Sequence, residues 1–194
     1  MYIVYRKTVI LSRRYLTSEV DYIIMLIIKM RRKAMPKEIK KITSFTVDHR
    51  YITPGVYVSR IDGDITTYDL RTRRPNCGDY MDDSTMHSME HMFATYVRNS
   101  DISDKVIYFG PMGCQTGFYL LIKDASNTET LVEIKKVLRS ICAHGGEMFG
   151  CSEIECGNYR TLSVENAKAE AARYLEYLES HDQNFEYPKG DTER

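Results

Sequence analysis

The sequence predicts an α+β fold: a single domain in which an antiparallel or mixed β-sheet packs against helices. Short stretches rich in β-branched and aromatic residues are separated by turn signals, as strands are. Three longer stretches repeat apolar residues at the helical period. The two kinds of stretch do not alternate strictly, which argues against a parallel sheet built from βαβ units. The chain has 194 residues, enough to bury one core.

The N-terminal segment differs from the rest of the chain. Basic side chains outnumber acidic ones in residues 1–34, although the whole chain carries 27 of each. This segment shows no sustained period of a strand or a helix. We therefore predict that residues 1–34 are an extension, disordered or incidentally helical, that is not part of the native domain, and that the domain spans residues 35–194. The alternative is a helix on a membrane surface, with residues 23–28 as its apolar face.

Charge and cysteine content exclude several classes of protein. With 27 basic and 27 acidic residues, the chain offers no net positive charge to nucleic acid. No stretch reaches the roughly 18 apolar residues of a membrane-spanning helix. We therefore expect neither nucleic acid nor a membrane as a partner. The five cysteines are an odd number without regular disulfide spacing, which is typical of free thiols in the reducing cytoplasm.

We expect strands and turns in the first part of the domain. Residues 42–49 alternate partly between apolar and polar side chains. Residues 56–58 and 65–70 have the composition of strands, and the Asp-Gly-Asp sequence at 62–64 is a hairpin turn signal between them. Residues 71–83 are predicted to be a polar loop.

A helix is predicted from Ser84, which can cap its N-terminus, to about Asn99. Asp82 and Asp83 carry negative charges that favour this end of a helix. The helix has an apolar stripe at the 3.6-residue period, which we expect in the core: Met89, Phe93, Tyr96 and Val97.

Two strands and a helix are expected next. Residues 106–109 form an apolar run typical of a buried strand, and residues 117–122 form another, with a turn at 110–114 between them. The sequence from Ser126 to Glu129 is a capping box that starts a helix, and Gly145-Gly146 ends it.

The last helix is expected to begin after Ser163 as its cap. Residues after 181 are polar, and we expect them to be frayed. Both of these later helices have an apolar face. These faces consist of Leu131, Ile134, Leu138 and Ile141 in the first, and of Ala167, Ala171, Leu175 and Leu178 in the second.

His87 and His91 stand four residues apart, with Glu90 directly before the second histidine. On a helix, positions i and i+4 share a face, so the two imidazoles can reach one metal ion. Glu90 would lie close enough to act on a water or substrate there. The H-x-x-E-H order is the inverted form of the zincin motif. The alternative is that all three are ordinary surface residues of an amphipathic helix.

A catalytic metal site of this kind needs a third ligand, and a cysteine thiolate is a strong one. Cys114, Cys151 and Cys156 are the candidates, and spacing does not choose between Cys114 and Cys156, each of which adjoins a glycine. A zinc knuckle made by Cys151 and Cys156 is disfavoured because no second cysteine pair accompanies it.

Five motifs, in this order along the chain, resemble the S-ribosylhomocysteine lyase family, known as LuxS. They are Ser44-Phe45-Thr46-Val47-Asp48-His49, Asp69-Leu70-Arg71, His87-Ser88-Met89-Glu90-His91, Gly110-Pro111-Met112-Gly113-Cys114-Gln115-Thr116-Gly117-Phe118-Tyr119 and Cys156-Gly157-Asn158-Tyr159. The resemblance covers roughly residues 35–180. Residues 1–34 have no counterpart in the family pattern. The resemblance implies a LuxS-like metalloenzyme fold.

The resemblance also implies an activity. Members of the family are cytoplasmic carbon–sulfur lyases. They cleave S-ribosylhomocysteine to homocysteine and 4,5-dihydroxy-2,3-pentanedione, the precursor of the autoinducer-2 signal, by carbonyl migration and β-elimination. They are homodimers with their active sites at the subunit interface.

Roles for five residues of the site follow from the same resemblance. His87, His91 and Cys156 would hold one divalent metal ion per subunit, natively Fe²⁺, with Zn²⁺ or Co²⁺ as substitutes. Glu90 and Cys114 would be the two general acid/base residues.

Further positions match the substrate-binding part of the family pattern, and one departs from it. Ser44, His49 and Arg71 match residues that help to hold the substrate. The family usually has an acidic residue six positions before the turn cysteine, where this chain has Tyr108. A polar contact to the Cys114 thiol is therefore expected to be missing or replaced by a phenol, and Tyr108 is given no catalytic role.

Two other functions stand as alternatives. An inverzincin metalloprotease also contains H-x-x-E-H, but its glutamate activates water and a downstream glutamate is its third ligand. That function would leave Cys114 and Cys156 without a role. A non-catalytic metal-binding module would keep its metal and its fold, and lose nothing, when Glu90 or Cys114 is replaced.

Overall fold

The computed structural model describes residues 19–33, 39–124 and 126–189. It divides into two compact units, Met1–Lys41 and Ile42–Arg194, which we describe separately.

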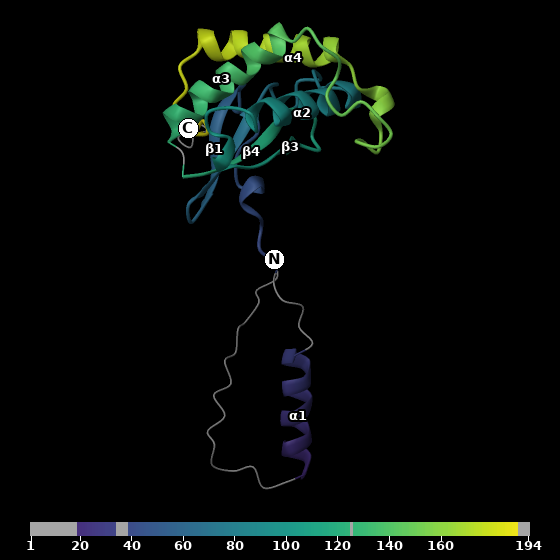
Figure 1. Cartoon of the computed structure of the whole chain (residues 1–194). Helices are drawn as coiled ribbons and strands as arrows, with labels where there is room; N and C mark the ends of the chain where they lie inside the picture. Colours follow the sequence, from purple (N-terminus) through teal and green to yellow (C-terminus); the bar gives the residue numbers. More distant parts are fainter. Residues whose placement is uncertain (1–18, 34–38, 125, 190–194) are drawn as a thin grey trace. The chain divides into compact units, whose positions relative to one another are not determined.

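The first unit contains helix α1 (Glu19–Lys33), drawn in purple in Figure 1. Its side chains from residue 22 to residue 29 are all exposed. Among the helices of the described residues, none is long and apolar enough to cross a membrane. The predicted extension, residues 1–34, falls partly outside the described residues, and the domain boundary stays a prediction.

The second unit contains a four-stranded antiparallel sheet, which confirms the α+β class. The strands are β1 (Gly55–Asp62), β2 (Ile65–Arg71), β3 (Val106–Pro111) and β4 (Gly117–Lys123), in the spatial order β1-β2-β4-β3. The turn between β1 and β2 lies at the predicted Asp-Gly-Asp sequence. There Gly63 has a φ of 63°, which glycine adopts without strain.

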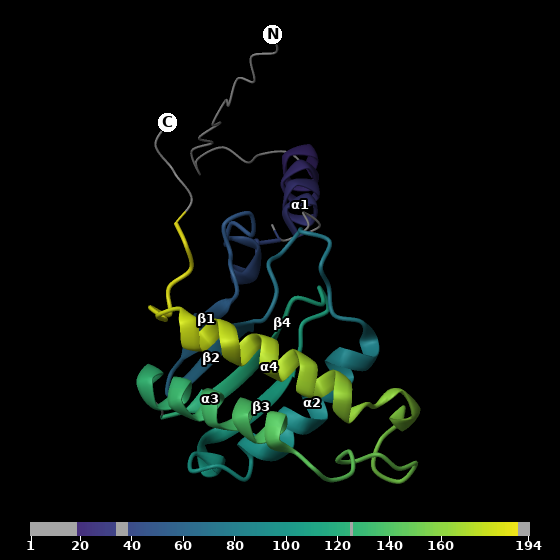
Figure 2. The same ribbon diagram turned by 90° about the horizontal axis from the view of Figure 1, so that it is seen from above.

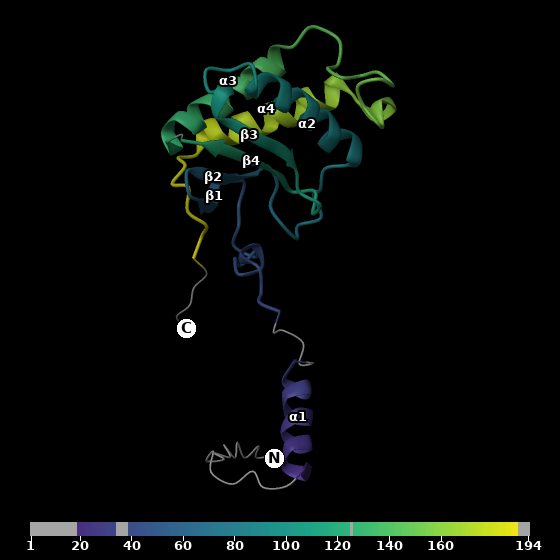
Figure 3. The same ribbon diagram turned by 60° about the horizontal axis from the view of Figure 1, so that its bottom comes forward.

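Three helices cover one face of this sheet: α2 (Asp83–Val97), α3 (Asn127–Ala143) and α4 (Val164–Ser180). Figure 1 shows them above the strands, and Figure 3 shows the same arrangement from a tilted view. Ser126 and Ser163 accept hydrogen bonds from the amides of Glu129 and Asn166 at the starts of α3 and α4. Both predicted caps are therefore confirmed.

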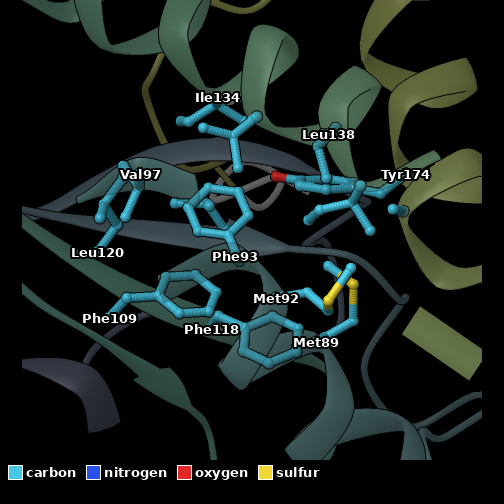
Figure 4. Packing of buried hydrophobic residues seen from close by; sticks show 14 of the residues in the cluster. Met89, Met92, Phe93, Val97, Phe109, Phe118, Leu120, Ile134, Leu138 and Tyr174 are labelled. Carbon is cyan, nitrogen blue, oxygen red and sulfur yellow. The ribbon is translucent and has the colours of Figure 1, made fainter. Parts of the chain in front are cut away.

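The core lies between the sheet and the helices. Alternate residues of the strands face it, including Tyr68 and Leu70 of β2, because side chains alternate across a strand. From α2, Phe93 stacks on Phe109 with 4.2 Å between ring centroids, and Phe109 stacks on Phe118 at 5.1 Å. Figure 4 shows Phe93 lying between these two rings and the α3 residues Ile134 and Leu138. This packing fixes α2, which carries the two histidines.

The predicted start of α2 is wrong by two residues. Asp82 caps the helix, since its carboxylate accepts a hydrogen bond from the Thr85 amide at 2.6 Å. Ser84 lies inside the helix, and its hydroxyl donates to the Thr161 carbonyl at 2.5 Å. This contact attaches α2 to the loop before α4.

The prediction of a buried strand at residues 106–109 is only half right. Phe109 is buried, but Ile107 and Tyr108 are about half exposed. The register of β3 shifts between Val106 and Tyr108, and the helices cover only one face of the sheet (Figure 1), so these two side chains are left open.

The prediction of a frayed segment after residue 181 is wrong for the described residues up to 189. The Val58 amide donates to the Phe185 carbonyl at 2.8 Å, and the Val56 amide donates to the Gln183 side chain at 2.9 Å. Phe185 also forms a parallel bridge with Tyr57. Figure 2 shows this C-terminal segment, in yellow, leaving the end of α4 near β1.

Candidate metal centre

Three candidate ligands come together from two parts of the chain. His87 and His91 lie one turn apart on α2, and Cys156 comes from the loop between α3 and α4. Their ligand atoms all lie within 4.8 Å of one another. The Cys156 sulfur is 3.4 Å from Nε2 of His87. The sequence left Cys114 and Cys156 as equal candidates, and the structure brings Cys156 to the histidines.

The Cys156 sulfur is positioned by a tight turn of its own loop. The Cys156 amide donates to the Ser152 carbonyl at 3.0 Å, which closes the turn. The Asn158 amide points at the sulfur from 3.4 Å. These two contacts hold the sulfur on the side of its loop that faces His87.

His91 is held by a hydrogen bond on the side of its ring away from the cluster. Its Nδ1 lies 2.8 Å from the Phe149 carbonyl oxygen, which can only accept, so Nδ1 carries the proton. The lone pair is then on Nε2, as a metal ligand requires. No residue pattern points to this partner, because any residue can supply a backbone carbonyl.

Gly150 makes room for the His91 ring. Its φ is +65°, and a Cβ on this residue would come within 2.9 Å of Nδ1 of His91. An alanine here would be strained and would push on the imidazole. Gly150 was not singled out from the sequence, since only the fold brings it against α2.

The protonation state of His87 also suits a metal ligand. Burial lowers its pKa from the usual 6.5, and the positive form of His91 lowers it further, while Glu90 acts in the opposite direction. The neutral imidazole is therefore favoured at neutral pH. Two neutral imidazoles and one thiolate form a donor set that fits a divalent ion and leaves a position open for substrate.

A cleft of about 610 Å³ opens beside the three ligands. Its walls include Glu90, and also Ala94, Thr95 and Arg98 from the next turns of α2. Glu90 is partly buried there. A carboxylate therefore lies in the same cleft as the metal-binding cluster, where it can exchange protons with a bound molecule.

Cys114 lies in the turn between β3 and β4, with an exposed side chain. Its sulfur is 3.0 Å from the Thr116 hydroxyl and 3.8 Å from Nη1 of Arg71. The turn is attached to the region where α2 begins, because the Met81 amide donates to the Gln115 carbonyl at 3.0 Å. Cys114 is not among the residues that line the cleft around His87.

Arg71 is buried, with only 2% of its surface exposed. Its Nε and Nη2 donate to the two carboxylate oxygens of Asp69 at 3.1 and 2.5 Å, and its Nη1 donates to the Thr116 hydroxyl at 2.5 Å. The guanidinium therefore places a positive charge beside Cys114. Its donors face protein groups and not the cleft.

The other two predicted substrate-binding residues lie in the segment before β1. Ser44 is in a short 3-10 turn (Thr43–Phe45) and is partly buried. His49 donates from Nδ1 to the Val47 carbonyl at 2.9 Å. Its positive form acts on Asp69 electrostatically, which places His49 near the Asp69–Arg71 pair.

Tyr108, at the position where an acidic residue was expected, is 48% exposed. Its ring lies over Gly110, where a Cβ would overlap the phenol. The polar contacts that the structure gives to the Cys114 sulfur come from Thr116 and Arg71.

These features define an α+β protein with a His–His–Cys cluster that could hold a metal ion, formed by α2 and the loop between α3 and α4, beside a cleft. The family model described as S-Ribosylhomocysteinase (LuxS) matches residues 42–185. The chain belongs to the LuxS family.

Relatives named S-ribosylhomocysteine lyase occur in several bacteria. The protein from Borreliella burgdorferi (strain ZS7) is 41% identical over 156 residues, which cover 77% of this chain and 99% of the relative. That from Clostridium beijerinckii is 41% identical over 157 residues, covering 77% and 99%. That from Phocaeicola vulgatus is 41% identical over 157 residues, covering 77% and 98%.

Proposed function

We propose that this chain cleaves S-ribosylhomocysteine to homocysteine and 4,5-dihydroxy-2,3-pentanedione, the autoinducer-2 precursor. The observation that carries the proposal is the cluster of His87, His91 and Cys156, whose ligand atoms lie within 4.8 Å of one another in a cleft that also contains Glu90. The name of the relatives supports the substrate.

The chemistry explains why two proton-transfer groups are needed. The ribose carbonyl at C1 is too far from the thioether at C5 for direct elimination. The carbonyl moves from C1 to C2 and then to C3, each time by loss of a proton from the carbon beside it and return of a proton to the former carbonyl carbon. Loss of the C4 proton then expels homocysteine thiolate from C5, and the resulting enol becomes the diketone. No electrons enter or leave.

We propose that His87, His91 and Cys156 hold one divalent ion per subunit, Fe²⁺ in the cell, with Zn²⁺ or Co²⁺ as substitutes. When bound, such an ion supplies Lewis acidity that draws electron density from the substrate oxygens and so acidifies the protons next to the carbonyl.

Glu90 and Cys114 are the proposed general acid/base pair. Glu90 lies in the cleft on the same helix as both histidines, so it can move protons on carbons near the metal-binding cluster. The exposed Cys114 sulfur lies beside the positive charge of Arg71, which stabilises negative charge on a group that accepts a proton.

Ser44, His49 and Arg71 are the proposed substrate-positioning residues. Because Arg71 is buried and paired with Asp69, it contributes through the charge that it places at Cys114, while the partly buried Ser44 and His49 are the ones that can contact substrate.

The experiment that tests this function is free-thiol release from S-ribosylhomocysteine by protein purified without oxygen and loaded with Fe²⁺ or Co²⁺. Wild type is expected to release homocysteine. Glu90→Gln and Cys114→Ala should keep the metal and release none, whereas His87→Ala and Cys156→Ala should lose the metal. Cys77→Ala, which removes another exposed thiol, is the matched control and should behave as wild type. No thiol release by loaded wild type would overturn the assignment.

We also propose a cytoplasmic homodimer with its active sites at the interface. The five cysteines are all free, which suits a reducing compartment. The sheet face opposite the helices bears Tyr108 and Leu121, which pair across β3 and β4 and are exposed and partly exposed. Sedimentation equilibrium should give twice the chain mass of 22.6 kDa, and a mass of one chain would contradict the dimer.

A further inference from the structure

The C-terminal segment after α4 brings one side chain to the buried ion pair next to Cys114. This segment pairs with β1 through the Phe185 carbonyl and the Gln183 side chain. Two residues further on, the Tyr187 ring stacks on Tyr57, with centroids 4.9 Å apart and planes at 12°. The match to the family model ends at residue 185, so Tyr187 lies beyond it.

The Tyr187 hydroxyl donates a hydrogen bond to Oδ2 of Asp69 at 2.8 Å. This is the same oxygen that accepts from Nη2 of Arg71. Burial, and then the negative charge of Asp69, raise the pKa of Tyr187 well above its usual value of 10.0. The phenol therefore stays protonated at neutral pH and remains a donor to Asp69.

A continuous set of contacts then runs from Tyr187 to the sulfur of Cys114. Tyr187 holds Asp69, and Asp69 holds Arg71 by two parallel hydrogen bonds. The remaining guanidinium nitrogen, Nη1, contacts the Thr116 hydroxyl and lies 3.8 Å from the sulfur. Two hydrogen bonds to a planar guanidinium fix its orientation, so a shift of the carboxylate would turn Nη1 relative to the sulfur.

We propose that Tyr187 is a positioning residue for the active site, because its hydroxyl holds Asp69 and thereby aims the Arg71 guanidinium at the Cys114 thiol. The inference rests on the proposed function only in assigning Cys114 a part in proton transfer. It assigns the C-terminal segment a role in the reaction that the family-matched residues do not include.

Other ionisable groups face the same pair. Burial raises the pKa of Asp69, and the charge of His49 opposes this. Burial also raises the pKa of the Tyr119 phenol, which the charges of Asp69, Arg71 and Cys114 affect as well. The hydroxyls of two more neighbours have other partners: that of Tyr57 donates to the Thr53 carbonyl, and that of Tyr174 to the Gly55 carbonyl. Tyr187 is thus distinguished by its direct hydrogen bond to the carboxylate.

The test replaces only the hydroxyl. Tyr187→Phe keeps the ring on Tyr57 and removes the hydrogen bond to Asp69. Tyr57→Phe is the matched control, since it removes the hydroxyl of the other ring in the same stack, which binds Thr53 and not Asp69. Both variants should bind the metal and melt as cooperatively as wild type.

Two measurements separate positioning from general stability. The first is kcat and KM for thiol release, where Tyr187→Phe should lower kcat by about tenfold and change KM little, as expected when a reacting group is misplaced. The second is the rate of iodoacetamide alkylation of Cys114 across pH, followed by mass spectrometry of the peptide that contains it. In Tyr187→Phe the alkylation should be slower than in wild type over the pH range measured, because the Arg71 guanidinium no longer faces the Cys114 sulfur squarely.

Equal kcat values and equal alkylation rates for Tyr187→Phe and Tyr57→Phe would overturn the inference. The alkylation measurement needs no turnover. If wild type released no homocysteine, the proposed function would fail, while slower alkylation in Tyr187→Phe would still support the positioning role. A double variant adds a further check: in an Arg71→Lys background, Tyr187→Phe should slow the alkylation no further, since both changes break the same set of contacts.

Discussion

His91 depends on a glycine that makes no bond to it. Gly150 has a φ of +65°, and its missing side chain leaves the space in which Nδ1 of His91 reaches the Phe149 carbonyl. We predict that Gly150→Ala lowers metal affinity by roughly 10- to 100-fold, the effect typical of losing a partner that orients a ligand. Competition with a chelator measures this.

Gly145→Ala is the control for that change. A Cβ at Gly145 would meet nothing within 4 Å, and its φ is not positive. This variant should bind metal as wild type does. If the two variants behaved alike, the space at Gly150 would not matter for His91.

The buried pair of Asp69 and Arg71 should be sensitive to the loss of either partner. The two side chains are 1% and 3% exposed. Asp69→Ala would leave the guanidinium buried without its counter-charge, which typically costs about 3–5 kcal/mol of unfolding free energy. Urea denaturation measures this. Asp62→Ala, which breaks the pair with Arg60 at half-exposed side chains, should cost no more than about 1 kcal/mol.

Single residues were predictable from the sequence where the chemistry is local. The spacing of His87 and His91 requires only that the segment be helical. Cys156 could be chosen over Cys114 only through family resemblance, because its approach to His87 depends on the whole loop between α3 and α4. The burial of Arg71 was not predictable, since it follows from how β2 meets the turn after β3.

The helix α2 carries three residues of the site, so the hydrogen bond that caps its first turn matters for the site as well as for stability. Asp82→Ala should lower the unfolding free energy by about 1 kcal/mol at pH 7, as the loss of an N-cap does. Asp182→Ala, another exposed aspartate, should change it by less than about 0.5 kcal/mol.

The effect of Asp82 should depend on pH. The Thr85 amide lowers the pKa of Asp82 from its usual 3.8. Because the folded pKa lies below the unfolded one, the stabilisation is complete above pH 3.8 and is lost as the pH falls through the folded value. The difference between wild type and Asp82→Ala should therefore be smaller in acid than at pH 7. An undiminished difference in acid would contradict a charged cap.

Helices and hairpins were predictable because their signals are short-range. Both serine caps and the Asp-Gly-Asp turn lie where the sequence places them. The exposure of Ile107 and Tyr108 was not predictable, because an apolar run reveals neither a register shift nor which of its side chains face away from the helices. Ser84 was mistaken for a cap because its true partner, the Thr161 carbonyl, is distant in sequence.

For the whole molecule, we propose that residues 1–34 are not needed for folding or turnover. The family match begins at residue 42, and the compact unit that holds the site begins at the same residue. Protein lacking residues 1–34 should keep its melting temperature and its rate of homocysteine release. A loss of either, measured against the full chain, would show that the segment contributes.

The position of the C-terminal segment is the whole-molecule feature that the sequence least revealed. Its residues are polar and carry no strand pattern, so composition alone predicted fraying, yet Gln183 and Phe185 pair with β1. Their partners are backbone amides, which any sequence presents.

The codons of this C-terminal segment are therefore sensitive to truncating mutations. A nonsense mutation at codon 183 removes only the last twelve residues of the chain. In this protein such an allele deletes the pairing at β1 and the phenol on Asp69 together, so we expect it to behave as a loss-of-function allele.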